Sequence, residues 1–225
     1  MKRLDLGQRV LVLSFVVLIF VPIGYADQAY AAPSSNILAV PYHAEERHGF
    51  CGPTSIQMAL EYISGNVTAQ KVLAAEMNTD PNGIGTLNAN MVIPFHNRGY
   101  TTVRPNSATL EILKDWNWRG YVSIIDIWWD TDRKDGHFVV VTGYNETGII
   151  VNDPYPPPPS TRPQPHSRTT GPNAFISNQL LAVLWKSNQW ALVVPYPELR
   201  TNTPTNRMEC LQTTTATLSM TIKFS

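Results

Sequence analysis

The chain has 225 residues, of which 43% are hydrophobic and 15% are charged, and its formal net charge at pH 7 is +0. This length fits one domain of ordinary size with a substantial core once a leader has been removed. The balanced charge and the lack of a basic stripe exclude a nucleic-acid partner and give no sign of binding to an acidic membrane surface.

The N-terminus has the three parts of a targeting segment. Basic residues at positions 2, 3 and 9 precede a nearly unbroken apolar run over residues 10–23, and residues 29–31 read Ala-Tyr-Ala. Small residues at this spacing suit a leader peptidase, and the run is shorter than the roughly 20 residues that span a bilayer. We expect a signal peptide or N-terminal anchor over residues 1–31, cleaved near Ala31 or Ala32 if it is a signal peptide.

The domain is therefore expected to work outside the cytoplasm, as a secreted protein or one anchored by its N-terminus. An uncleaved N-terminal segment is the only membrane contact we expect. The domain itself should cover residues 32–197, and residues 198–225 form a Thr- and Asn-rich extension.

The chain has two cysteines, Cys51 and Cys210. Exported proteins often pair their cysteines, and a bridge between these two would silence either thiol. The residues around Cys51 favour a reactive thiol instead.

The first half of the domain is predicted to be helical. Apolar residues recur at helical spacing over residues 53–63, with a proline in the first turn and a Ser-Gly-Asn run at the end. Thr68 is expected to cap a second helix and Thr86 a third, which Pro94 bends or shortens. A short fourth helix follows Ser107.

The second half changes to the β-branched and apolar runs typical of strands, at residues 121–127, 138–144, 149–151 and 190–196. An Asn-Glu-Thr-Gly turn joins the second and third runs into a hairpin. A proline-rich loop covers residues 155–165, and a helix is expected over residues 175–185. The order of elements predicts an α+β fold, with a helical N-terminal half packed on an antiparallel sheet half.

Three residues of this arrangement form a candidate cysteine nucleophile system. Cys51 precedes Gly52 at the start of the first helix, where unpaired N–H groups and the helix dipole favour a thiolate and where glycine leaves room for a substrate backbone. His137 opens one strand of the hairpin and Asp153 closes the next, so the hairpin brings them close together. A carboxylate beside a histidine fixes its tautomer and orientation.

Each of the three also has a structural interpretation: a packed cysteine, a surface histidine and a strand-ending turn. Their order and spacing together favour catalysis. This chemistry needs no metal and no organic cofactor.

At these residues the sequence resembles the C39-like peptidases, which have the papain-like fold. The shared motifs are Val-Pro-Tyr at residues 40–42, Cys-Gly-Pro-Thr-Ser at 51–55, Gly-His-Phe-Val-Val-Val-Thr-Gly-Tyr at 136–144 and Asn-Asp-Pro-Tyr at 152–155. The resemblance implies Cys51 as the nucleophile, His137 as general base and acid, and Asp153 as the residue that orients His137. It also implies a peptide or protein substrate.

The chain departs from this family at one position of the oxyanion hole. Relatives usually carry a glutamine about six residues before the cysteine, and here that residue is Glu45. An ionised carboxylate cannot donate a hydrogen bond to an oxyanion, and losing one donor typically costs about 10²–10³ in rate. The donor could instead be protonated Glu45, His43 or His48, or the hole could rest on the Cys51 N–H alone.

Two polar clusters fit no metal site. The segment 43–48 contains two histidines, but their spacing differs from that of His-Glu-x-x-His. The aspartates over residues 126–135 lack the glycine and glutamate of an EF-hand. We interpret both as solvated loops.

Trp128 and Trp129 lie among these aspartates and are candidates for a substrate groove, since aromatic residues are common on recognition surfaces. With Glu45 they support a second hypothesis, in which the domain is a weak or inactive relative that binds peptide or cell-wall polymer.

Overall fold

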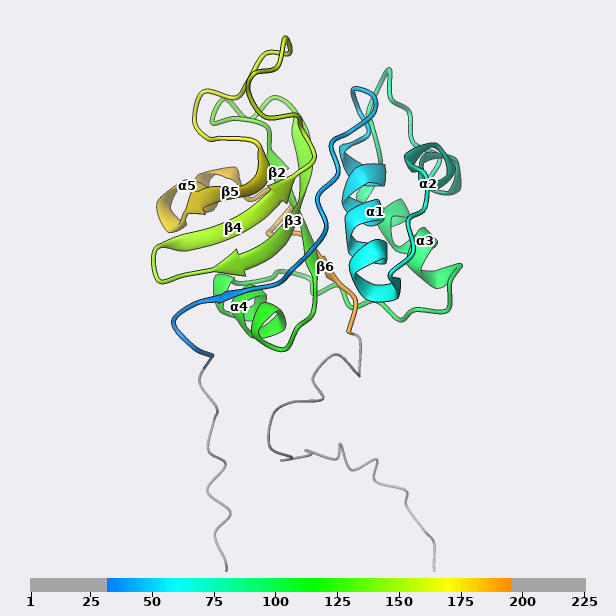
Figure 1. Ribbon diagram of the computed structural model, residues 1–225. Coiled ribbons are helices and arrows are strands. Elements are labelled where there is room, and N and C mark those ends of the chain that lie inside the picture. The colour runs from blue at the N-terminus through cyan, green and yellow to red at the C-terminus, as the bar shows by residue number, and fades with distance from the viewer. Residues whose placement is uncertain (1–31, 196–225) are drawn as a thin grey trace, which may run out of the picture. The chain divides into compact units, whose positions relative to one another are not determined.

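The computed structural model describes residues 32–195 (Figure 1). The predicted leader, Cys210 and the C-terminal extension lie outside the described residues. The helices are α1 (Cys51–Ser64), α2 (Gln70–Glu76), the 3₁₀ helix η1 (Asn88–Val92), α3 (Ile93–His96), α4 (Leu110–Trp118) and α5 (Asn178–Leu184). The strands are β1 (Asn36–Ile37), β2 (Ser123–Trp128), β3 (Gly136–Tyr144), β4 (Gly148–Asp153), β5 (Gly171–Ser177) and β6 (Ala191–Val193).

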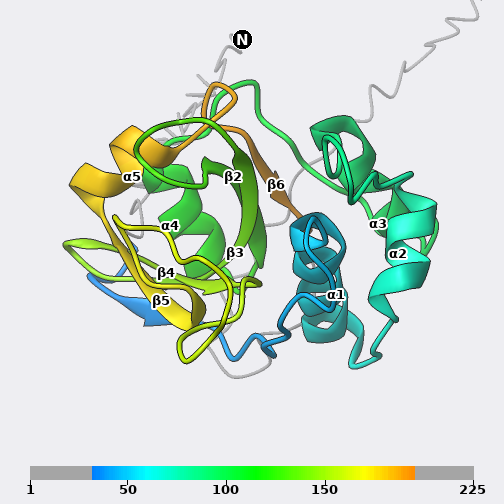
Figure 2. The ribbon, with the colours of Figure 1, turned by 90° about the horizontal axis from the view of Figure 1, so that it is seen from above.

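The strands form one antiparallel sheet in the order β5-β4-β3-β2-β6, with β1 pairing to β3. Figures 1 and 2 show α1, α2 and α3 gathered on one side of the sheet. Helices α4 and α5 pack against its other face. The predicted α+β architecture, a helical first half packed on an antiparallel sheet, is confirmed.

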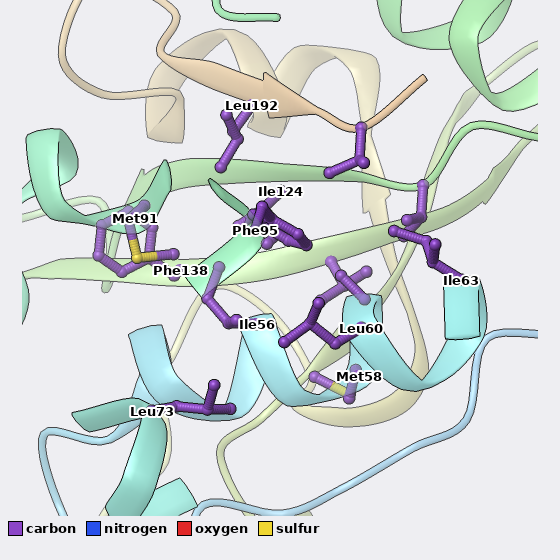
Figure 3. Close-up of a cluster of buried hydrophobic side chains, with 14 of the residues drawn as sticks. Ile56, Met58, Leu60, Ile63, Leu73, Met91, Phe95, Ile124, Phe138 and Leu192 are labelled. Atoms are coloured by element: carbon purple, nitrogen blue, oxygen red, sulfur yellow. The ribbon is translucent and has the colours of Figure 1, made fainter. Parts of the chain in front are cut away.

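Helix α1 is the central helix of the first half. It ends where Gly65 adopts a left-handed conformation (φ 73°) and donates its N–H to the carbonyl of Glu61 at 2.8 Å, a conformation that glycine adopts without a steric cost. Its buried face packs against the sheet (Figure 3), where Ile56 and Leu60 meet residues of β2 and β3. Burying each such side chain stabilises the fold by about 1.5–3 kcal/mol.

The sheet has a separate apolar cluster on each face because successive strand residues point in opposite directions. On β2 and β3, Ile124 and Val140 belong to the cluster with α1, whereas Ile125 and Val139 belong to the cluster with α4 and α5. Both faces are covered, which explains why these strands read as continuous apolar runs.

The helix predicted over residues 175–185 is partly wrong. Residues up to Ser177 belong to β5, and α5 begins only at Asn178, where the Ser177 hydroxyl accepts the N–H of Leu180 at 3.2 Å. Phe175 is 42% exposed between Ala174 at 4% and Ile176 at 0%, the alternation of a strand. The apolar residues of this short strand continue directly into those of α5, which gives the sequence the look of one helical run.

The predicted caps of the second and third helices are also wrong. Ala69 is the N-cap of α2, and the carbonyl of Thr68 accepts from Gln57 instead. Thr86 precedes the N-cap of η1, and its hydroxyl is hydrogen-bonded to the hydroxyl of Thr79 at 2.8 Å. Pro94 lies in the first turn of α3, which is only four residues long, so the predicted shortening is confirmed.

Candidate active site

Cys51 is the first residue of α1, so its side chain lies beside the unpaired N–H groups of the first helical turn. The N-cap, Phe50, has no side-chain acceptor for these groups. A helix start of this kind stabilises a negative charge such as a thiolate. Among residues 32–195 the Cys51 thiol has no disulfide partner, and the residue is partly buried.

Gly52 has a different role from the predicted one. A Cβ atom at this position would lie 2.6 Å from the Thr86 hydroxyl and 2.9 Å from the Thr86 Cβ. Glycine is therefore required so that the start of α1 can pack against the segment that holds Thr86, and the space beside it is not open to substrate.

His137 and Asp153 are in direct contact. Nε2 of His137 lies 2.7 Å from Oδ1 of Asp153, and both side chains are buried. Burial lowers the pKa of His137, but the charge of Asp153 and hydrogen bonds to Asp153 and Cys51 outweigh it and raise that pKa from 6.5 to about 10. The imidazole is therefore protonated at neutral pH, with Nε2 on Asp153 and Nδ1 left for Cys51.

A β-bulge brings the two residues together. Tyr144 pairs with Ile149 and Gly143 with Ile150, but beyond Thr142 the register shifts, so that Val141 pairs with Val151. Paired residues point to the same side of a sheet, and a shift of one residue reverses that side. Continuing the shifted register places Asp153 beside Val139, on the side of the sheet to which His137 also points.

Arg168 is a residue of the site that no sequence motif indicates. Its Nη1 donates to Oδ2 of Asp153, opposite the oxygen that accepts from His137, and its side chain is fully buried. The guanidinium also lies over the ring of Trp129, 5.2 Å from its centroid. It comes from a polar loop, and no local pattern singles it out.

Asp153 is held ionised by these neighbours. It accepts from His137, from Arg168 and from the N–H of Tyr155 at 2.8 Å. Burial alone would raise its pKa, but the positive charges of His137 and Arg168 and the hydrogen bonds hold that pKa below 3.8. A buried carboxylate between two cations is a fixed point on which the histidine ring can be oriented.

Of the two predicted groove residues, Trp129 lines the cavity and Trp128 does not. Trp129 lines the cavity beside Cys51 and contacts the His137 ring edge-on, with 5.1 Å between centroids. Trp128 packs with the second apolar cluster, and the Lys186 ammonium lies 4.6 Å from its ring centroid.

Glu45 lies in the same cavity as Cys51, and its side chain is only 2% exposed. Its Oε1 accepts from Nη1 of Arg162 at 2.6 Å, and its backbone N–H donates to the carbonyl of Pro154 at 2.7 Å. Burial raises the pKa of Glu45, and the neighbouring positive groups, with His137 and Arg162 first among them, offset only part of this effect.

Of the two histidines considered as oxyanion donors, His43 contacts Glu61 at 2.5 Å, whereas His48 lines the cavity. The Val-Pro-Tyr motif is fixed to the sheet because the Asn152 amide donates to the carbonyl of Val40 at 3.0 Å.

The cavity has a volume of about 720 Å³ and lies between the two halves of the fold. One wall comes from residues 45–51 and 81–88, and the other from β2, the start of β3 and the proline-rich loop. Within residues 32–195 there is no group of three or more His, Cys, Asp or Glu side chains that could hold a metal ion. None of the helices in this part of the chain has the length and apolar character of a membrane span.

A thiol at a helix start, in one cavity with a histidine that is held by a buried carboxylate, is the arrangement typical of cysteine peptidases. Residues 37–170 match the Peptidase_C39 like family. The chain belongs to this family.

Two solved structures share the fold of this chain. A putative C39-like peptidase from Bacillus anthracis aligns with a TM-score of 0.56 at 15% identity, over 73% of this chain and 98% of that one. A double glycine motif protease from an AMS/PCAT transporter, solved with its leader peptide, aligns with a TM-score of 0.51 at 16% identity, over 72% of this chain and 95% of that one. The comparison with curated proteins found no match.

Proposed function

We propose that this chain is a cysteine peptidase that hydrolyses peptide bonds through Cys51, His137 and Asp153. The observation that carries the proposal is a histidine held by a buried carboxylate in the same cavity as a thiol at a helix start. This arrangement favours a thiolate–imidazolium pair at neutral pH, which is the reactive form of a thiol nucleophile.

In the proposed reaction, the Cys51 sulfur attacks the substrate carbonyl carbon and the carbonyl oxygen becomes an oxyanion. As the oxyanion collapses, the C–N bond breaks, and His137 gives its proton to the leaving amine. The product bound to the enzyme is a thioester. His137, now neutral, takes a proton from water, the hydroxide attacks the thioester, and the acid and the thiolate are released.

Alkylation tests the role of the thiol. We expect purified mature protein to cleave members of a peptide panel, and we expect iodoacetamide or Cys51→Ala to abolish cleavage. Cys210→Ala, which removes the chain's other cysteine, is the matched control and should remain active. Cleavage that persists in Cys51→Ala would disprove the proposal.

A second candidate function is binding without catalysis, and the Glu45–Arg162 pair favours it because an ionised carboxylate near Cys51 would repel an oxyanion. A binder would retain its ligand in Cys51→Ala. Its thiol would be alkylated only at the alkaline pH at which an unactivated thiol ionises, near 8.5.

We also propose that the domain acts outside the cytoplasm, on the evidence of the basic start, the apolar run and the Ala-Tyr-Ala sequence at residues 29–31. The mass of the mature protein, recovered from cells and from medium, would test this. A mature chain that starts at residue 1 and stays in the cytoplasm would contradict it.

A further inference from the structure

The Glu45–Arg162 pair presents its positive end to the cavity. The side chain of Glu45 is 2% exposed, whereas that of Arg162 is 31% exposed, and both residues line the cavity with Cys51. A substrate entering this cavity therefore has more access to the guanidinium than to the carboxylate.

Only one nitrogen of the Arg162 guanidinium is hydrogen-bonded to a protein acceptor among residues 32–195. Nη1 of Arg162 donates to Glu45, while no protein acceptor is recorded for Nε and Nη2 among residues 32–195. Unlike the Nε and Nη2 of Arg168, these two groups are not shut away from solvent. The Nε–Nη2 edge of an arginine matches the two oxygens of a carboxylate.

The two lysines that line the cavity, Lys134 and Lys186, each have an acidic partner. The Lys134 ammonium lies 3.1 Å from Asp132, and its side chain is 76% exposed. The Lys186 ammonium is 4.0 Å from Asp126 and lies over the ring of Trp128. Of these three cations, Arg162 is the one with a planar guanidinium, which can offer two parallel N–H donors to a carboxylate.

Arg162 is close to the reacting groups. Its guanidinium lies 5.6 Å from the ring centroid of Tyr155, which is 4.6 Å from that of Trp129, which in turn contacts His137 at 5.1 Å. Because an extended peptide advances about 3.3–3.6 Å per residue, Arg162 lies within about four residues of the bond to be cleaved.

We propose that Arg162 is a specificity residue that binds a carboxylate of the substrate near the scissile bond, with Glu45 holding the guanidinium in place. This inference rests on the proposed peptidase function and names the chemistry of its substrate. The carboxylate is either an acidic side chain or the free C-terminus of a peptide cut close to its end.

The test compares matched peptides in which one position at a time is Asp or Asn, each made with a free and with an amidated C-terminus. We expect the wild type to cleave one member of such a pair about 10- to 100-fold faster in kcat/KM, the range for a charged hydrogen bond. A preference for Asp over Asn identifies a side chain as the ligand, and a preference for the free over the amidated end identifies the C-terminus.

In Arg162→Gln the preference should fall to about onefold, and in Arg162→Lys, which keeps the charge but not the fork, to an intermediate value. The matched control is Arg98→Gln. Arg98 pairs with Glu76, has a similar side-chain exposure of 28% and does not line the cavity. This variant should retain the full preference.

A wild type without any preference, or a preference that survives in Arg162→Gln, would overturn the proposal. The same peptides are also titrated against Cys51→Ala with and without Arg162→Gln, following tryptophan fluorescence. If no peptide is cleaved but the carboxylate preference in binding disappears with Arg162, the peptidase function fails and the assignment of Arg162 holds. If binding has no carboxylate preference either, both fail.

Discussion

Replacing Asp153 by Asn tests the electrostatics of the site most directly. The variant keeps the shape of the side chain but removes the charge that, with its hydrogen bond, raises the pKa of His137 to about 10. Burial, which lowers that pKa, remains. Because the charge of Asp153 is the largest of the effects that raise it, the pKa of His137 should fall well below its wild-type value of about 10.

The assay is the rate of Cys51 alkylation by iodoacetamide as a function of pH. In the wild type we expect the alkylation rate to stay constant through neutral pH. This plateau should end only near pH 10, where His137 loses its proton. In Asp153→Asn the thiol should react as an ordinary one, of which about 3% is ionised at pH 7. Alkylation at pH 7 should then be about 30-fold slower.

Loss of folding has to be separated from loss of charge, because Asp153→Asn leaves the buried Arg168 unpaired, which typically costs about 3–5 kcal/mol. The double variant with Arg168→Met removes both charges and should be more stable than the single variant while still lacking the plateau. Asp126→Asn is the matched control, since Asp126 is a buried carboxylate of β2 that bonds Asn88 and not His137. An unchanged plateau in Asp153→Asn would refute the reasoning.

Three further predictions follow from the same contacts. Arg168→Gln should destabilise the fold by about 3–5 kcal/mol, as for a broken buried ion pair, which thermal unfolding measures. The same variant should move the alkaline end of the alkylation plateau to higher pH, because a cation near His137 is lost, and a shift to lower pH would contradict this role. Glu45→Gln should raise kcat for neutral peptides by about tenfold or more, since an amide can donate to the oxyanion, and an unchanged or lower kcat would show that residue 45 does not face it. The stability of the wild type should decline as the pH rises from about 6.5 to about 10, because the raised pKa of His137 contributes stability that is lost as the ring deprotonates, and should also decline in acid as Asp153 is protonated; denaturant unfolding across this range measures both, and a flat profile would contradict them.

Much of the fold could be predicted because local signals and tertiary structure agree. The Cys-Gly-Pro run begins α1 and the Ser-Gly-Asn run ends it, where Gly65 takes the left-handed conformation. The apolar runs became strands covered on both faces. At Phe175 the local signal was ambiguous, because three alternating residues before a true helix are too few to establish a period of two.

The charged partners of the site could not be predicted in the same way. Arg162 and Arg168 come from the loop after Asp153, whose prolines and small polar residues have no periodicity that fixes the direction of a side chain. Their roles depend on tertiary contacts with Glu45, far along the chain, and with the buried oxygen of Asp153. Sequence could identify the nucleophile system but not the ion pairs that adjust it.

The hairpin illustrates why a correct motif did not amount to a predicted geometry. A hairpin continued in the register of Gly143 and Ile150 would pair Asp153 with Val140, whose side chain belongs to the α1 face of the sheet. Asp153 would then point away from His137, since paired residues share a face and the period of a strand is two. The shift at Thr142 reverses this outcome, so the contact between the histidine and its carboxylate depends on one additional residue in β3. A glycine such as Gly143 is typical of a bulge, but it does not fix where along the run Val-Val-Val-Thr-Gly-Tyr the extra residue falls, so the separation of the two side chains becomes definite only when the whole sheet is assembled.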